Sequence, residues 1–135
     1  MGEHLDMRSS MNSNQNGFPG TNLSPAPELF GIIGLQTRNE LNPIITLAGT
    51  VGISGDAGDS FLISIVRGAT FAPGNVIYSS EGAVSITGLT QLHSFNLQDL
   101  LAPPAAETVY TAFISGASTS VRNGPEVFYG KASGH

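Results

Sequence analysis

The chain has 135 residues, which suits one domain plus a short extension. Its net charge is −5 and its five basic residues are scattered, which excludes the clustered Lys and Arg that nucleic acid or an anionic membrane surface requires. The absence of cysteine excludes disulfides and thiolate metal sites.

The first 27 residues differ in composition from the rest of the chain. They are rich in Ser, Asn, Gln, Gly and Pro, with isolated apolar side chains at Leu5, Phe18 and Leu23. Such a segment cannot build a core, so we expect residues 1–27 to form a flexible N-terminal arm and residues 28–135 to form the folded domain. The segment also lacks the apolar h-region of a secretory signal, so we expect synthesis in the cytoplasm.

The strands begin directly after this arm. Leu29–Gln36 is apolar and glycine-spaced, and we expect it to be the first strand. In Ile45–Ser54 every odd position except Gly49 is large and apolar, whereas every even position is Thr, Ala, Gly or Ser. This alternation predicts a strand with one core face and one smooth, uncharged face.

A turn at Gly55–Asp59 leads into Phe61–Arg67, and the two strands around this turn predict a hairpin. Asn96 is positioned to cap a single helical turn through Leu101, and we expect a tight turn at Glu81-Gly82. Further strands are expected over Val76–Ser79, Val84–Ile86, Leu92–Leu97, Thr108–Ser115 and Val127–Lys131. The predicted fold class is therefore all-β, a single antiparallel β-sandwich or jelly roll of about eight strands, preceded by an extended N-terminal arm.

Few residues here carry reactive chemistry. His93 lies beside Ser94 and six residues before Asp99, but no Gly-x-Ser-x-Gly element presents a nucleophile. Asp56 and Asp59 are a close acidic pair on a turn, and two carboxylates fall short of the six to eight oxygens that Ca²⁺ prefers. We therefore expect no enzyme activity, no catalytic residues, no metal and no cofactor. The longest apolar runs are also too short to span a membrane.

Several strand patterns, at Ile63–Gly68, Val76–Ser79, Thr108–Ser115 and Gly124–Gly130, resemble the small jelly-roll proteins of the exosporium and endospore appendages of spore-forming Firmicutes. The likeness covers roughly residues 29–131. It implies a subunit made without a signal peptide, deposited on the spore surface, and linked to its neighbours through an N-terminal connector. Several appendage subunits cross-link through connector cysteines. This sequence has none, so cohesion would come from strand addition and packing.

The residues alone, without the resemblance, also support the hypothesis of an assembling subunit. A flexible arm followed by an apolar strand can complete the open sheet of another copy. The expected partners are further copies of the chain, with other spore-surface proteins as possible additions, and the alternative is an idle tail on a monomer. A second functional class is a soluble carbohydrate- or receptor-binding β-sandwich, such as an adhesin or phage structural module. The candidate subunit-contact residues are Phe18, Leu23, Leu29, Phe30, Ile32, Ile33, Leu35, Thr46 and Thr50.

Overall fold

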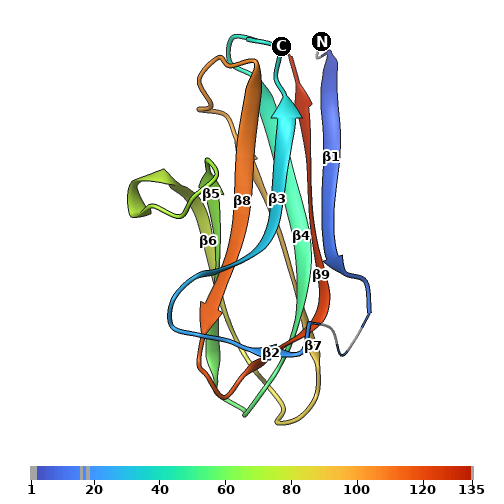
Figure 1. The fold of residues 1–135 in the computed structure, drawn as a ribbon, viewed down its shortest axis with the longest axis vertical. Coiled ribbons are helices and arrows are strands. Elements are labelled where there is room, and N and C mark those ends of the chain that lie inside the picture. Colours follow the sequence, from blue (N-terminus) through green and yellow to red (C-terminus); the bar gives the residue numbers. More distant parts are fainter. Residues whose placement is uncertain (1–2, 16, 18, 135) are drawn as a thin grey trace.

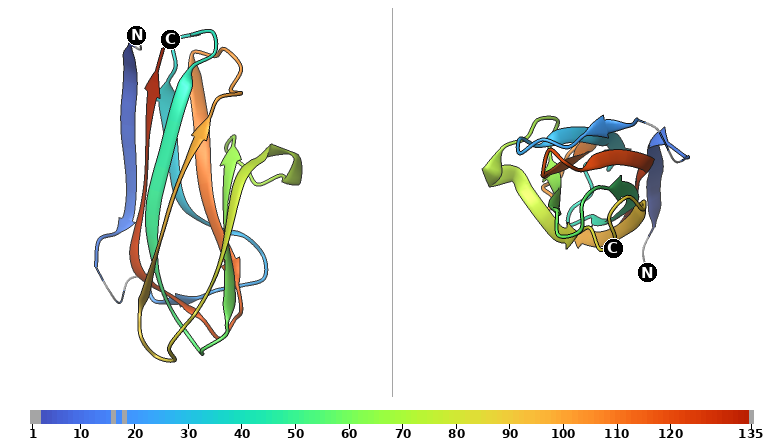
Figure 2. Two further views of the ribbon diagram at one scale, coloured as in Figure 1. Left: turned by 180° about the vertical axis from the view of Figure 1, so that it is seen from behind. Right: turned by 90° about the horizontal axis from the view of Figure 1, so that it is seen from below.

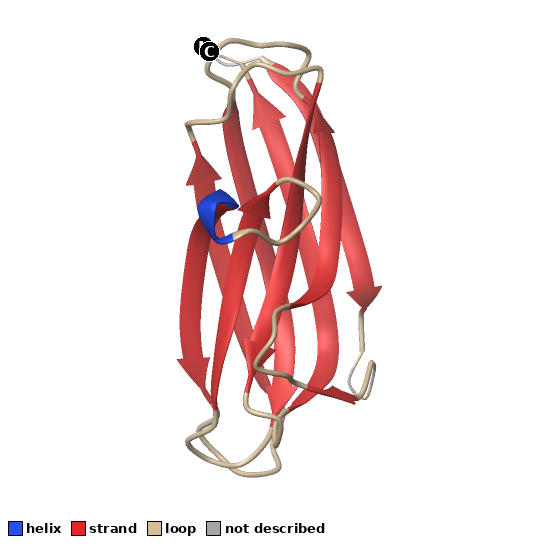
Figure 3. Cartoon of the chain, turned by 60° about the vertical axis from the view of Figure 1, so that its left-hand side comes forward, coloured by secondary structure: helices blue, strands red, loops and turns tan. Residues whose placement is uncertain are grey.

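Two antiparallel β-sheets pack face to face in a computed structural model that describes residues 3–15, 17 and 19–134 (Figure 1). The chain ends of the first and last long strands lie side by side at one end of the sandwich. The strands are β1 (His4–Ser13), β2 (Thr21–Asn22), β3 (Glu28–Gln36), β4 (Ile44–Ser54), β5 (Ser60–Arg67), β6 (Val76–Ala83), β7 (Gln91–Asp99), β8 (Glu107–Gly116) and β9 (Val121–Ser133). A 3-10 turn, Pro73–Asn75, precedes β6 (Figure 3).

The strand order identifies the topology. One sheet has the order β1-β9-β4-β7, with the short β2 also paired to β9, and the other has the order β3-β8-β5-β6. Seen along the long axis in Figure 2, the strands of the two sheets surround a common interior. Eight long strands arranged in this way form a jelly roll, which confirms the predicted fold class.

The core lies between the two layers and contains the residues that alternation predicted. Leu47 and Val51 of β4 and Ile63 and Ile65 of β5 all have 0% exposure. Strand β5 is also covered on its other face, where Ser64 and Val66 are buried. The loop after β5 explains this cover, because its Phe71 ring packs edge-on against Phe113 at 5.3 Å.

The structure differs from the expected flexible arm. Residues His4–Ser13 form β1, the first long strand of the jelly roll, which pairs with β9 of the same chain. Leu5 and Leu23 are both buried in the core. The physical reason is that an edge strand requires main-chain hydrogen bonds on one side only and little apolar surface of its own.

Other local expectations were wrong. Strands β4 and β5 do not form a hairpin, because the turn between them carries the chain from one sheet to the other. Glu81 and Gly82 continue β6, and residues 84–86 form no strand. The expected helical turn after Asn96 is absent, since β7 runs on to Asp99.

Gly52 of β4 lies directly against the main chain of β9, which leads to a prediction. A Cβ at this position would overlap the carbonyl group of Gly124, a main-chain atom that cannot rotate away. We expect Gly52→Ala to lower the free energy of unfolding by about 1–3 kcal/mol. Gly74→Ala is the matched control, because nothing lies within 4 Å of its Cβ position. Urea denaturation should separate the two variants, and equal stability would contradict the prediction.

Candidate functional site

Strand β1 lies at the edge of its sheet and is held by one neighbour. It pairs with β9 in a register that runs from His4 opposite Ser133 to Met11 opposite Val127. Its other edge has no strand partner among the described residues. The place that β1 fills beside β9 and β3 is called the slot below.

Polar side chains of β1 reach across to the second sheet. The main-chain N–H of Gln36 donates to Asp6 Oδ2 at 2.8 Å, and that of Ile32 donates to Ser10 Oγ at 3.4 Å. Because β3 is the outermost strand of its sheet, these N–H groups have no strand partner on this side. Side chains of β1 therefore close the edge of the second sheet. The hydrogen bond from Gln36, followed by that from Arg8, holds the pKa of Asp6 below its ordinary value.

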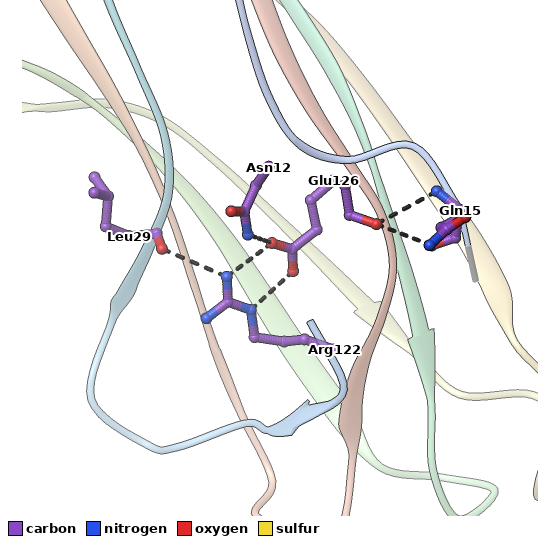
Figure 4. Close-up of polar contacts among 6 residues, drawn as sticks. Asn12, Gln15, Leu29, Arg122 and Glu126 are labelled. Carbon is purple, nitrogen blue, oxygen red and sulfur yellow. Dashed lines mark hydrogen bonds and ion pairs between the residues drawn. The ribbon is translucent and has the colours of Figure 1, made fainter. Parts of the chain in front are cut away.

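A buried ion pair lies at the lower end of β1 (Figure 4). Arg122 donates to both carboxylate oxygens of Glu126, each at 2.8 Å. Asn12 Nδ2 of β1 donates to Glu126 Oε1 at 2.7 Å, and Arg122 also reaches the carbonyl oxygen of Leu29 at 3.5 Å. These contacts connect β1, β3 and β9. We call Asn12, Arg122 and Glu126 the latch.

The ion pair of the latch is shielded from water, whereas Asn12 of β1 is exposed. The Glu126 side chain is 0% exposed and that of Arg122 is 9% exposed. The hydrogen bonds to Glu126 are the main reason that the pKa of Arg122 lies above its ordinary value. A second carboxylate, Glu28, lies close enough to add to this effect, and its Oε1 atom is buried without a hydrogen-bond partner.

The seam between β1 and β3 carries the exposed apolar side chains of Met11, Leu29 and Ile32, and Met7 lies further along the outer face of β1. Met7 and Met11 of β1 are each 61% exposed, and Leu29 and Ile32 of β3 are 49% and 46% exposed. A shallow hollow of about 210 Å³ lies between the two strands. Of the ten residues of β1 only Leu5 and Ser13 are buried, so polar contacts and the main-chain ladder hold this strand.

The outer face of the first sheet forms a second surface. Thr46, Ala48 and Thr50 lie on the face of β4 opposite the core, and the register places Ser94, Asn96 and Gln98 of β7 beside them. Thr50 and Ser94 share a hydrogen bond of 3.1 Å between their hydroxyl groups. The matching positions of β9 include Tyr129, which is half exposed, and Lys131, which is exposed and lies opposite Thr46. The smooth, uncharged face that the sequence predicted is therefore confined to β4 and its β7 neighbours.

The structure divides the candidate contact residues into groups. Leu23, Phe30, Ile33 and Leu35 are buried in the core of their own chain, so they face no partner here. Leu29 and Ile32 are exposed on the seam, and Thr46 and Thr50 lie on the outer face. Phe18 lies outside the described residues.

Sequence reasoning missed the polar residues of the slot: Asp6, Ser10, Asn12, Arg122 and Glu126. One signal was available. The segment from Glu3 to Gln15 contains neither Gly nor Pro, unlike the rest of the first 27 residues. Such a segment is compatible with a strand.

The residues considered for chemistry are not brought together. His93 Nε2 contacts Ser80 Oγ at 3.1 Å, whereas Ser94 bonds to Thr50. Asp59 Oδ2 accepts hydrogen bonds from the hydroxyls of Thr119 and Ser120, which hold its pKa below the ordinary value. No three His, Asp or Glu side chains of the described residues form a group that could hold a metal ion. Nor does any helix in this part of the chain have the length and apolarity needed to cross a membrane.

Asp99 instead belongs to a polar network that joins the two sheets. Arg67 of β5 donates to both of its carboxylate oxygens, at 2.7 and 2.6 Å, and Tyr110 of β8 donates to Oδ2 at 2.7 Å. The N–H of Leu101 adds a fourth bond at 3.1 Å. A cavity of about 610 Å³ lies beside this network and is also lined by Val76, Ile77, Gln98 and Leu100. With all its bonds made inside the protein, Asp99 has a structural role.

The fold and these surfaces define a jelly-roll β-sandwich, and comparison with solved structures places the chain in that class. It is similar to part of dimeric latent PorU from Porphyromonas gingivalis, with a TM-score of 0.58, 11% identity, and coverage of 99% of this chain and 13% of that one. It is also similar to a chain of the T13 particle of infectious bursal disease virus, with a TM-score of 0.57, 11% identity, and coverage of 96% and 31%.

A third match is the VP2 subviral particle of the same virus, with a TM-score of 0.56, 12% identity, and coverage of 96% and 32%. The chain thus spans about a third or less of the length of these proteins. At such low identity the likeness defines the fold and assigns no family. No family model matches the sequence, and no curated protein matches it.

Proposed function

We propose that this protein is a non-enzymatic structural subunit that self-assembles into a fibre or layer by exchanging β1 between copies and by packing its sheet faces. The observation that carries the proposal is the construction of β1. This N-terminal edge strand buries only two side chains and is otherwise held by main-chain and polar contacts that a second copy would reproduce.

Exchange of β1 changes the free energy little, because β1 of a second copy makes the same contacts in the slot as β1 of the same chain. A strand that leaves its own slot exposes the edges of β9 and β3, and an incoming β1 covers both again. When each copy donates its strand to the next, the contact is heterologous, and such contacts extend into open filaments unless the rotation closes a ring. The same strand therefore supports a closed monomer and a long assembly.

The exposed surfaces favour association of the assembled copies. The seam presents Met11, Leu29 and Ile32 together, and the outer face of the first sheet presents uncharged residues around Thr50, with Lys131 as the charged neighbour of Thr46. Apolar and uncharged surface can be covered by a neighbour without the desolvation cost of a buried charge. The likeness to VP2 in a subviral particle supports assembly of a jelly roll in general.

The proposed location is the surface of a spore or cell. It rests on the resemblance of residues 29–131 to spore-surface jelly rolls and on the expected synthesis in the cytoplasm. Partners there are further copies of the chain, with other spore-surface proteins as additional candidates. The same surfaces would hold this subunit without the cysteine cross-links of several appendage proteins.

Engineered cysteines test strand exchange directly, because the natural chain has none. Met7 and Lys131 are paired residues on β1 and β9. In one chain carrying Met7→Cys and Lys131→Cys, oxidation should join strand to slot, since paired strand residues lie within disulfide reach. Exchange predicts a covalent ladder on a denaturing gel without reductant, whereas a closed chain gives cross-linked monomers.

The two single variants provide the control. If β1 crosses between copies, Met7→Cys chains and Lys131→Cys chains mixed at high concentration should form the mixed disulfide dimer well in excess of the two homodimers, whereas random oxidation of exposed thiols gives only the statistical share. Negative-stain microscopy and light scattering of the natural protein should show fibres or sheets. A monomer at high concentration, with only intrachain disulfides, would contradict the proposal and favour the ligand-binding alternative.

A further inference from the structure

We infer that the slot recognises the sequence of β1 and that Asn12, through the buried Arg122–Glu126 pair, is the specificity-determining residue for a strand donated by a second copy. The inference rests on the proposed function. Beyond that function, the inference specifies the strand that the slot binds, the register in which this strand binds, and the residue on which selection depends.

The Glu126 carboxylate accepts three hydrogen bonds, and β1 supplies one of them. Both oxygens of Glu126 accept from Arg122, and Oε1 also accepts from Asn12 at 2.7 Å. The carboxylate is fully buried beneath β1. A side chain at position 12 must therefore donate a hydrogen bond to a buried charge, a requirement that an amide meets and that a carboxylate or an alkyl chain does not.

A slip by one residue is excluded by side-chain direction. Such a slip moves every side chain of β1 to the opposite face of the sheet. Met11, whose thioether cannot donate a hydrogen bond, or the short Ser13 would then take the place from which Asn12 donates to Glu126. The carboxylate would lose a donor in the first case, and the exposed face of the strand would turn inward in both.

A slip by two residues is excluded by Arg8. In the observed register Asp6 and Ser10 accept hydrogen bonds from the N–H groups of Gln36 and Ile32. Sliding β1 by two residues in either direction places Arg8 opposite one of these N–H groups. The guanidinium group only donates, so two donors would meet. The slot therefore fits β1 of this chain in a single register.

The first test changes the donor at position 12. Asn12→Asp places a second carboxylate against Glu126, and we expect transient opening of β1, measured as hydrogen exchange of its amides, to rise on the order of 100-fold. Asn14→Asp adds the same charge to an exposed residue just beyond β1 and should change exchange less than about threefold. Asn12→Leu, which removes the donor without adding charge, should give an intermediate increase.

The second test restores the latch within one chain. In Asn12→Asp with Glu126→Gln, an amide nitrogen in the place of Oε1 can donate to the new carboxylate, and the amide oxygen in the place of Oε2 can accept from Arg122 Nε. The single negative charge beside Arg122 is restored, although Arg122 Nη2 loses its acceptor on residue 126. Protection of β1 should return to within about tenfold of the natural chain. If Asn12→Asp behaves like Asn14→Asp, or if the double variant is not rescued although Glu126→Gln alone folds, the specificity role of Asn12 is overturned.

The third test restores the latch between chains. An Asn12→Asp chain has a β1 that binds weakly and a natural slot. A Glu126→Gln chain has a natural β1 and a slot that can bind the β1 carrying Asn12→Asp. Exchange between them creates two matched contacts. Mixing should therefore recover protection of β1 in an isotope-labelled Asn12→Asp chain. If protection of β1 is restored within a chain but not between chains, the slot does select residue 12, but the strand that fills it does not come from a second copy. That result would overturn strand exchange.

Discussion

Replacing Asp99 by Ala is expected to lower the free energy of unfolding by about 3 kcal/mol. The substitution removes the acceptor for Arg67 and for the hydroxyl of Tyr110, and Tyr110 is 0% exposed. A buried donor without an acceptor bears its full desolvation cost. The loss also separates the sheets at this point, because Asp99 is on β7 whereas both donors are on the opposite sheet. Urea denaturation followed by circular dichroism measures the effect.

The same network predicts how stability depends on pH. Burial alone raises the pKa of Asp99, but the hydrogen bonds from Arg67, Tyr110 and the Leu101 N–H outweigh it and bring the pKa below its ordinary value. A carboxylate with a lowered folded pKa stabilises the fold above its unfolded pKa of about 4, and this contribution is lost as pH falls through the folded value. Stability should therefore decline below about pH 4.

Two variants serve as controls for Asp99→Ala. Tyr110→Phe removes one hydrogen bond and leaves the Arg67 ion pair, so it should cost about 1 kcal/mol. Asp99→Asn keeps the size of the side chain but replaces one carboxylate oxygen by an NH2 group, which removes the titrating charge and should flatten the acid decline. A loss from Asp99→Ala no greater than that from Tyr110→Phe would show that the ion pair adds nothing to stability.

The fold class could be predicted because large apolar residues alternate with small or polar residues along the central strands. In β4 the large residues Leu47 and Val51 face the core and Thr46 faces outward, as a period of two requires. The partners of each strand could not be predicted. The turn between β4 and β5 has the composition of a hairpin turn, but whether it joins neighbours or crosses between sheets depends on contacts distant in sequence.

The slot escaped prediction for a related reason. Strand β1 has Met7 and Met11 on its outer face and Asp6 and Ser10 toward the second sheet, so its hydrophobic pattern is opposite to that of a core strand. Its inward polar residues can be recognised as part of a strand only once the open edge of β3, to which they hydrogen-bond, is known to lie beside them. Likewise Glu126 is an ordinary surface residue in the sequence, and its burial follows from Arg122 on the same strand and Asn12 on β1.

The two faces of β4 should respond differently to truncation. Leu47→Ala removes a side chain that is 0% exposed in the centre of the core and should lower the free energy of unfolding by about 2–5 kcal/mol. Thr46→Ala, on the adjacent outer face, should cost less than about 0.5 kcal/mol, because it loses little buried surface. Thermal unfolding of dilute protein compares the two, and equal losses would mean that the outer face is covered even in the monomer.

Thr46→Lys extends this comparison from folding to assembly. In a monomer the ammonium group can extend into water beside the exposed Lys131, and repulsion between two exposed like charges is small, so the melting temperature should stay within a few degrees of the natural value. In an assembly whose sheet faces pack on one another, the charge would be buried without a partner, and fibres or layers should weaken or disappear in electron micrographs. Loss of assembly with intact folding assigns this face to subunit contact. Unchanged fibres from Thr46→Lys would instead leave the exchanged β1 as the sole link between copies.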